Sequence, residues 1–212
     1  FRPPPCRWED CLWRVVGIDP GGGDPTAIVP LGVFRNDKGV TIIHQYDEFY
    51  RRNDVTTEHI AEYLGSLGKV DIVAVGETGG NLLINTLIRM GFPAQKADMS
   101  RTGIETVRWL IETNRLSIDD ERCPNSRAEF AGYRYSRARD QETGQRYATS
   151  TPADNHADAM DGRRYAEVAI MSAIGQERGP RQLEWKQPKS RRYLRETLKE
   201  RLLRKAREKK VI

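Results

Sequence analysis

Four acidic residues occupy positions where they could act on one ligand, although they lie far apart in the sequence. Asp19 ends an apolar run and precedes a bend of Pro and Gly, and Glu77 follows the apolar run 72–75. Asp158 and Asp161 stand three residues apart and therefore share one face of a helix. Strand ends and a helix face can meet at one edge of a sheet. We therefore expect these carboxylates to converge.

Carboxylates at such short range repel one another, which raises their pKa values unless a cation neutralises them. Oxygen ligands without a Cys or His partner suit hard ions such as Mg²⁺ or Mn²⁺. Two such ions roughly 3.5–4 Å apart can clamp the attacking and leaving oxygens of a phosphoryl displacement. The glycines after Asp19 would let a metal ion and a phosphate backbone approach without side-chain collision. Each acid alone is typical of a turn or a solvated helix face, whereas the four together favour a catalytic metal site.

Four further polar residues are candidates for auxiliary roles. Lys96 could contact a phosphate or help to orient the attacking water, and a solvated surface role fits its position equally well. Asp24 could be an outer-sphere partner of the metal or the opening residue of an Asp-Pro turn. Asp154 is expected to cap the helix that carries the acid pair. His156 could transfer a proton or bind a phosphate, and a structural hydrogen bond is the simpler interpretation.

Basic residues gather in two places. The segment 133–149 interleaves tyrosines with arginines, which on a protruding hairpin could neutralise DNA phosphates without reading base sequence, or could line a solvated loop. The candidate DNA contacts are Lys96, Arg101, Arg134, Arg137, Arg139 and Arg146. The stretch 175–212 has 14 Lys and Arg against 5 acids, whereas the preceding chain has 21 against 25. This tail could bind DNA, dock on another protein or be disordered.

The hydrophobic pattern predicts a mixed α/β sheet with helices on both faces. Strands predicted at 13–18, 26–34 and 40–49, the last two joined by a hairpin turn, indicate an antiparallel start. Short strands then alternate with helices, which predicts parallel additions. Predicted helices cover about 54–67, 81–90, 104–113, 125–133 and 155–174, and predicted short strands lie at 72–75, within 92–97 and at 116–118.

Length and composition fit one domain with appendages. The 212 residues are 38% hydrophobic, which is enough for a sizeable core. Residues 1–12, which include RPPP, are interpreted as a linker from a missing N-terminal region, 13–174 as the domain and 175–212 as a basic, partly helical tail. The three cysteines form neither a paired zinc motif nor a disulfide framework. No apolar run approaches the roughly 20 residues that span a bilayer, so we expect a cytosolic protein with no membrane partner.

Several segments resemble a known family. VVGIDPG and HADAMDGRRYA are similar to the first and last acidic motifs of RNase H-like, RuvC-type nucleases. Together with VAVGETGG and KADMSRTGIETVRWLIETNRLSID, they resemble the C-terminal nuclease domain of the large terminase subunit of tailed bacteriophages over about residues 13–170. The motif GxxxxGK[ST] of the packaging ATPase that normally precedes this domain does not occur, so either the chain is a fragment or the motor is a separate chain. Because the sequence has no initiator Met, we expect a fragment.

The resemblance implies an RNase H-like endonuclease that cuts concatemeric double-stranded DNA during genome packaging with two divalent metal ions, Mg²⁺ or Mn²⁺. It makes Asp19 the first metal ligand, Glu77 the second acid, and Asp161 with Asp158 the acids of the last helix. The implied partners are DNA, the portal protein, the small terminase subunit and the ATPase region of the same large subunit, in the host cytoplasm. Two alternatives remain, a RuvC-like junction resolvase and a catalytically silent DNA-binding or assembly module.

Overall fold

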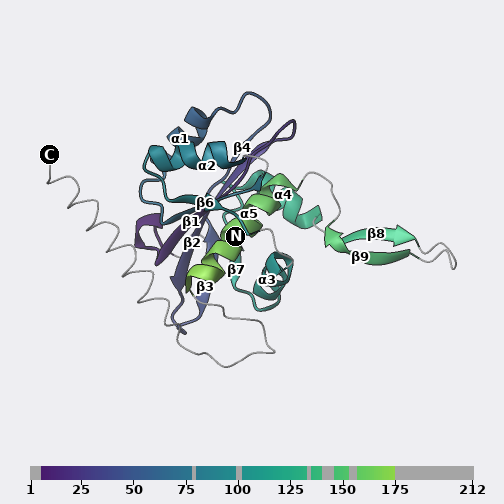
Figure 1. The fold of residues 1–212 in the computed structure, drawn as a ribbon. Helices are drawn as coiled ribbons and strands as arrows, with labels where there is room; N and C mark the ends of the chain where they lie inside the picture. The colour runs from purple at the N-terminus through teal and green to yellow at the C-terminus, as the bar shows by residue number, and fades with distance from the viewer. Residues whose placement is uncertain are drawn as a thin grey trace, which may run out of the picture.

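A seven-stranded sheet forms the centre of the molecule, with the strand order β6-β5-β1-β2-β3-β7 and with β4 paired to β2 (Figure 1). The computed structural model describes residues 6–77, 80–98, 102–132, 135–139, 146–152 and 157–174, with the backbone alone for 102–103, 135–139 and 146–152. The strands of the sheet are β1 (Trp13–Asp19), β2 (Thr26–Arg35), β3 (Thr41–Gln45), β4 (Phe49–Arg51), β5 (Ile72–Val75), β6 (Ala94–Lys96) and β7 (Leu116–Ile118).

The direction of strand pairing changes at β1. This strand pairs antiparallel with β2 and parallel with β5. The strand β2 also pairs antiparallel with β3 and β4, whereas β5 with β6 and β3 with β7 are parallel pairs. The predicted mixed sheet, antiparallel at its start and parallel in its additions, is confirmed. Because β1 and β5 are parallel, their carboxyl ends meet at one edge of the sheet.

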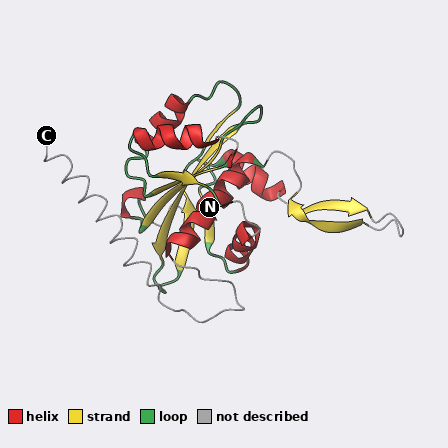
Figure 2. Ribbon diagram, in the orientation of Figure 1, coloured by secondary structure: helices red, strands yellow, loops and turns green. Residues whose placement is uncertain are grey.

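Helices cover both faces of this sheet (Figure 2). One face is covered by α1 (Thr57–Ser66) and α2 (Gly80–Arg89), and the other by α5 (Asp158–Ile174). The helices α3 (Thr102–Glu112) and α4 (Pro124–Gly132) pack against α5, and the short 3-10 helix η1 (Trp8–Asp10) precedes β1. Apart from the start of α5, these helices lie close to the predicted ranges.

Side chains of β1 alternate between the two hydrophobic cores. Val16 and Ile18 enter the core beneath α1 and α2, whereas Val15 enters the core beneath α5. Successive side chains of a strand point to opposite faces, so Gly17 and Asp19 lie on the α5 side with Val15. The alternation therefore directs the carboxylate of Asp19 toward the face that α5 covers.

The α5 backbone rests directly on β1. A Cβ atom on Gly17 would lie 1.8 Å from the carbonyl oxygen of Gly162, so no side chain fits between the two elements. Gly162 follows Asp161 in the chain, and Gly17 lies two residues before Asp19. This close approach fixes the first turns of α5 against the end of β1.

The single strand predicted at 40–49 is wrong, because β3 and β4 are separate strands that both pair with β2. Pro30 lies between the two paired stretches of β2 and has no N–H to donate. The N–H of Tyr46 donates to the carbonyl oxygen of Pro30 at 3.2 Å, after which the chain leaves the ladder and returns as β4. The proline therefore interrupts the pairing that a continuous strand would need.

A hairpin projects from the body of the molecule (Figure 1). Its strands, β8 (Tyr135–Arg139) and β9 (Arg146–Pro152), pair antiparallel with each other. This agrees with the hairpin predicted within 133–149. The helix predicted from residue 155 is described from Asp158, because 153–156 lie outside the described residues.

The segment that precedes β1 packs on the domain, although its sequence predicts a linker. Cys11 is buried, and the hydroxyl of Tyr46 donates to the carbonyl oxygen of Cys6 at 2.8 Å. Arg14 donates from Nη1 to the carbonyl oxygen of Glu9 at 3.0 Å. Residues from Cys6 onward therefore contact the domain. These contacts depend on the fold, so a Pro-rich local sequence does not predict them.

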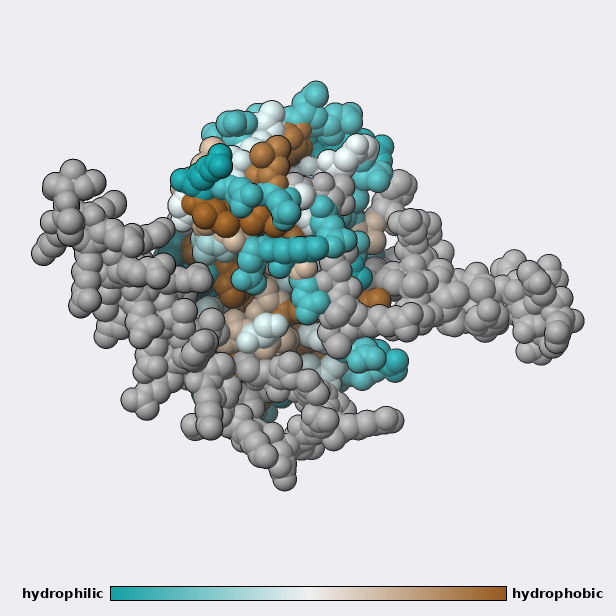
Figure 3. Space-filling model, in the orientation of Figure 1, coloured by the Kyte–Doolittle hydropathy of each residue, from teal (hydrophilic) through white to brown (hydrophobic). Residues whose placement is uncertain are grey.

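Apolar surface is exposed over α1 and α2 in the view of Figure 3. Leu82 and Ile88 of α2 are among the exposed large hydrophobic side chains. Within the described ranges, no helix is both long and apolar enough to cross a membrane.

Candidate metal and active site

Asp19 occupies the end of a central strand and is held on both sides. Its backbone pairs with Ala27 of β2, and the N–H of Gly76 donates to the carbonyl oxygen of Ile18 at 2.9 Å. A strand paired on both edges and buried on both faces is a rigid support for a charged side chain. The position of the Asp19 carboxylate is therefore set by the sheet rather than by a mobile loop.

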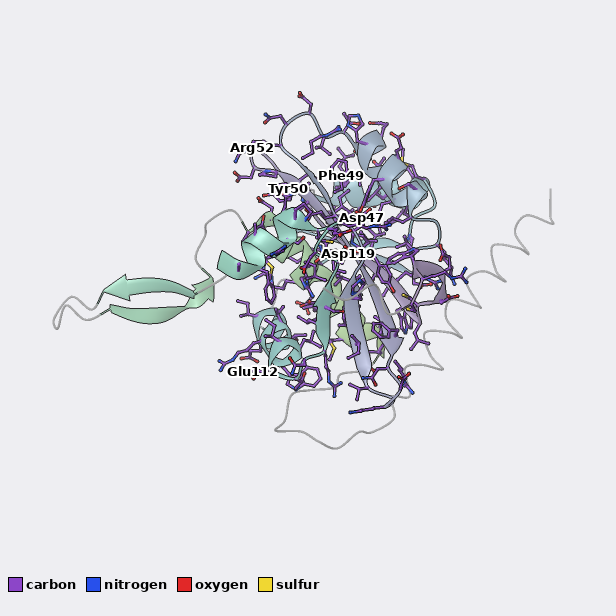
Figure 4. All side chains as sticks on the ribbon, turned by 180° about the vertical axis from the view of Figure 1, so that it is seen from behind. Asp47, Phe49, Tyr50, Arg52, Glu112 and Asp119 are labelled. Atoms are coloured by element: carbon purple, nitrogen blue, oxygen red, sulfur yellow. The ribbon has the colours of Figure 1, made fainter. Side chains whose placement is uncertain are left out.

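The first turn of α5 brings Asp158 and Asp161 to the same edge. The hydroxyl of Tyr50, from β4, donates to Oδ2 of Asp158 at 3.2 Å. Figure 4 shows Tyr50 near α4, at the end of the sheet opposite to Glu112 of α3. Asp161 is partly exposed, with 32% of its side-chain surface accessible. Asp158 is anchored by a neighbouring strand, and Asp161 has room to bind a ligand.

Asp19 lies close enough to Asp161 and Asp158 for their charges to change its pKa. Burial, followed by the negative charges of Asp161 and Asp158, raises the pKa of Asp19 from 3.8 to about 7. The guanidinium of Arg164 acts in the opposite direction, and Glu129 adds a further upward contribution. A carboxyl group with such a pKa is close to half protonated at neutral pH. Asp19 is therefore a group that a nearby cation would return to its charged state.

Glu129 of α4 is a fourth acid at this site, and nothing in the sequence pattern predicts it there. Its Oε2 accepts a hydrogen bond from the backbone N–H of Met160 at 3.0 Å, in the first turn of α5. Burial raises the pKa of Glu129, while the backbone N–H groups of Met160 and Ala159 and the hydroxyl of Tyr50 lower it. Its Oε1 is buried and has no hydrogen-bond partner among the described residues. The residue thus caps α5 with one oxygen, while the other is buried without a hydrogen-bond partner among the described residues.

The position of α4 is itself fixed by a carboxylate. Oε1 of Glu48 accepts from the backbone N–H of Asn125 at 2.7 Å, and Oε2 accepts from the backbone N–H and hydroxyl of Ser126 at 2.7 and 2.6 Å. Gln45 Nε2 donates to the same Ser126 hydroxyl at 2.7 Å. Acceptors at the N-terminus of a helix satisfy N–H groups that have no partner inside the helix. Glu48 therefore holds the helix that carries Glu129.

Arg164 and Tyr165 complete the edge of the site. Nη2 of Arg164 lies 3.0 Å from Oδ1 of Asp161, and its Cζ lies 5.5 Å from the centre of the Tyr165 ring. Tyr165 is buried against the end of β5, where a Cβ on Gly76 would lie 2.7 Å from its ring and 3.2 Å from Oδ1 of Asp19. Burial and the charges of Asp19 and Asp161 raise the pKa of Tyr165, so its hydroxyl stays protonated.

Glu77 lies apart from this buried group. Its side chain is 61% exposed, and its Oε1 lies 2.5 Å from Nζ of Lys96, which lowers the pKa of Glu77 through a hydrogen bond and its charge. Gly76, rather than Glu77, faces Asp19 at the end of β5. Glu77 lies beyond the end of β5, and its exposed side chain pairs with Lys96.

The other predicted site residues are the auxiliary residues and the candidate DNA contacts. Asp24 is exposed in the loop between β1 and β2. Arg101, Arg134, Asp154, His156 and the tail 175–212 lie outside the described residues. The backbones of Arg137 and Arg139 lie in β8 and that of Arg146 in β9. Their proposed DNA contacts stay predictions.

The donor chemistry of this edge fits divalent metal ions. Asp19, Asp158 and Asp161 offer carboxylate oxygens, which are the ligands that Mg²⁺ and Mn²⁺ prefer. The charged form of Asp19, which burial and the neighbouring acids disfavour, and the buried, unpartnered Oε1 of Glu129 would both be stabilised by a cation. Over the described ranges, no three His, Cys, Asp or Glu side chains are already grouped tightly enough to hold a metal ion. Binding there would therefore require these side chains to move.

The mixed sheet with α5 packed on β1 is an RNase H-like fold, and the solved structures that it resembles include nuclease domains of phage large terminases. The bacteriophage SPP1 large-terminase nuclease domain with bound Mn is 20% identical, with a TM-score of 0.60, and is matched over 77% of this chain and 90% of that chain. The large terminase nuclease of thermophilic phage G20c is 16% identical with a TM-score of 0.52, over 76% of this chain and 83% of that chain. The resemblance drawn from the motifs is confirmed.

Longer terminase chains are matched over part of their length. The HK97 bacteriophage large terminase is 14% identical with a TM-score of 0.53, over 74% of this chain and 39% of that chain. The large terminase of another thermophilic bacteriophage is 19% identical with a TM-score of 0.60, and 41% of it is covered. This chain therefore corresponds to less than half of those proteins. No protein-family model matches the sequence, and no curated protein matches it significantly.

Proposed function

We propose that this chain is the metal-dependent endonuclease domain of a viral genome-packaging terminase, which hydrolyses phosphodiester bonds in concatemeric double-stranded DNA. The observation that carries the proposal is the approach of Asp158 and Asp161 to Asp19, whose pKa is raised to about 7 by burial and then by these two charges. Acids are rarely gathered in this way unless a cation offsets their repulsion. The likeness of the fold to terminase nuclease domains, one of them with bound Mn, supports the same conclusion.

Asp19, Asp158 and Asp161 are the residues proposed to hold two divalent ions, Mg²⁺ or Mn²⁺. Ions bound there would supply an activated water and stabilise the departing oxygen of the phosphodiester. The chain's own contribution is positioning: β1 holds Asp19, Tyr50 orients Asp158, and Glu129 holds the first turn of α5. Glu77 would join the ligands only after it leaves Lys96, which would then be available to a DNA phosphate.

The proposed partners follow from the same function. The arginines of the β8–β9 hairpin and the basic tail are proposed to contact the DNA backbone, with little preference for base sequence. The portal protein, the small terminase subunit and an ATPase region are proposed partners in a packaging complex in the host cytoplasm. Each of these partners is a separate hypothesis from the chemistry of the acid cluster.

The test is cleavage of linear double-stranded DNA with Mn²⁺, comparing the wild-type chain with Asp19→Asn and with Glu62→Gln, an exposed acid on α1. We expect cutting by the wild type and by Glu62→Gln, and none by Asp19→Asn, with Ca²⁺ failing to replace Mn²⁺ because of its looser coordination geometry. A preference for four-way junctions would favour a resolvase. Unchanged cutting by Asp19→Asn, or no cutting by the folded wild type, would contradict the proposal.

A further inference from the structure

Two adjacent arginines of α5 have different environments. Arg163 is buried, with 2% of its side chain accessible, and its Nε donates to Glu167 at 2.7 Å while Nη1 donates to Gln45 at 3.1 Å. Arg164 turns the other way and pairs with Asp161. Arg163 therefore pairs with groups in the interior of the domain, whereas the guanidinium of Arg164 contacts the acid cluster.

Arg164 is a cation that offsets the acid cluster in the metal-free protein. It lies 3.0 Å from Asp161, and only 14% of its side chain is accessible to solvent. Its charge also acts on Asp19, where it opposes the effects of Asp161 and Asp158. Without this guanidinium, the repulsion among the acids would raise the pKa of Asp19 further.

A divalent ion and Arg164 would need the same carboxylate. Asp161 keeps 32% of its side chain accessible, and its Oδ1 is the atom that Arg164 contacts. The guanidinium of Arg164 has a second favourable contact, because its Cζ lies 5.5 Å from the centre of the Tyr165 ring. A guanidinium over an aromatic ring keeps a favourable cation–π contact after its carboxylate partner is taken.

We propose that Arg164 is an internal counter-ion that a divalent metal ion displaces from Asp161, so that this residue tunes the metal affinity of the site. The inference rests on the proposed function, since it assumes that the acid cluster binds metal. In the metal-free protein Arg164 holds the cluster together. On metal binding it leaves Asp161 and keeps its contact with Tyr165, and the free energy of the broken ion pair is subtracted from that of metal binding.

The test is the Mn²⁺ dissociation constant of the full chain, measured by calorimetry without DNA. Removing a competing ion pair of about 1 kcal/mol should tighten Mn²⁺ binding by about fivefold in Arg164→Gln. Arg164→Lys keeps the positive charge and should change the affinity much less. The matched control is Arg108→Gln, which removes a guanidinium from an exposed ion pair with Glu112 on α3 and should leave the affinity unchanged.

An arginine with a purely structural role would give weaker Mn²⁺ binding when replaced, and one that only contacts DNA would give no change. Either result for a folded Arg164→Gln overturns the inference. If that variant does not fold, Mg²⁺ is titrated into the wild type while the side-chain Nε–H signal of Arg164 is followed by NMR. A shift on saturation is expected, and a signal that stays fixed overturns displacement. Failure of the wild type to bind Mn²⁺ would instead refute the proposed function.

Discussion

Replacing Asp19 by Asn should stabilise the metal-free protein, and the effect should depend on pH. The pKa of Asp19 is raised from 3.8 to about 7 by burial and by the acids of α5. The folded state therefore holds a proton that the unfolded state releases between about pH 4 and pH 7. Stability contributed by that proton is fully present below about pH 4 and is lost as pH rises through about 7. At higher pH the wild type carries the full cost of a buried, repelled carboxylate.

The size of the effect follows from the two pKa values. Each pKa unit corresponds to about 1.4 kcal/mol, so the difference gives an upper limit of about 4 kcal/mol at about pH 8. Partial solvent access reduces this, and we expect Asp19→Asn to raise the free energy of unfolding by about 2 kcal/mol. Asn has nearly the same shape as Asp and carries no charge, so at about pH 4 the two proteins should have similar stability.

The assay is urea denaturation in EDTA at about pH 4.5 and about pH 8, with the slope of the transition checked for constancy. Adding Mn²⁺ at the higher pH should raise the midpoint of the wild type and leave that of Asp19→Asn nearly unchanged, because ligand binding stabilises only the protein that binds it. Equal stability of the two proteins at the higher pH, or a stabilisation of the same size at both pH values, would refute the electrostatic account of the site.

Three other predictions concern the frame of the site. Gly17→Ala should abolish folding, seen as loss of the cooperative transition in circular dichroism, because its Cβ would lie 1.8 Å from a carbonyl oxygen of α5. Gly162→Ala is the matched control, since its Cβ would find its nearest neighbour at 3.4 Å, and it should fold normally. Tyr50→Phe removes the hydrogen bond to Asp158 and should weaken Mn²⁺ binding by a few fold, measured by calorimetry, at a cost in stability of about 1 kcal/mol. Glu129→Ala removes an acceptor from the first turn of α5 and should lower the free energy of unfolding by about 1–2 kcal/mol in urea denaturation, with Glu129→Gln costing less.

Local patterns were sufficient for most of the elements. The short strands β5 and β7 have the predicted bounds. The first is a compact apolar run, and the second alternates Leu, Ser and Ile between Asn114 and Asp119, which are typical turn residues. Pro30 carried a signal for the break between β3 and β4, since a proline within a strand removes one ladder hydrogen bond. Pro30 lies in β2, whereas the break separates its partner strands β3 and β4. The effect of this proline can therefore be predicted only when the pairing register is known.

The candidate site was only partly visible in the sequence. Asp19, Asp158 and Asp161 could be linked because each ends a strand or lies on a helix face. Glu129 could not, because it lies in a short polar helix and reaches the site only through the packing of α4 on α5. The direction of the Glu77 side chain depends on how the chain leaves β5, which residue types and spacing do not determine.

The contact between β1 and α5 also bears on when the molecule could become active during synthesis. β1 leaves the ribosome well before α5, which is the last helix of the described residues. The acids that the two elements bring together therefore remain apart until everything between them has emerged. Under the proposed function, a nascent or truncated chain would lack the acids of α5 and would therefore be unable to cut DNA.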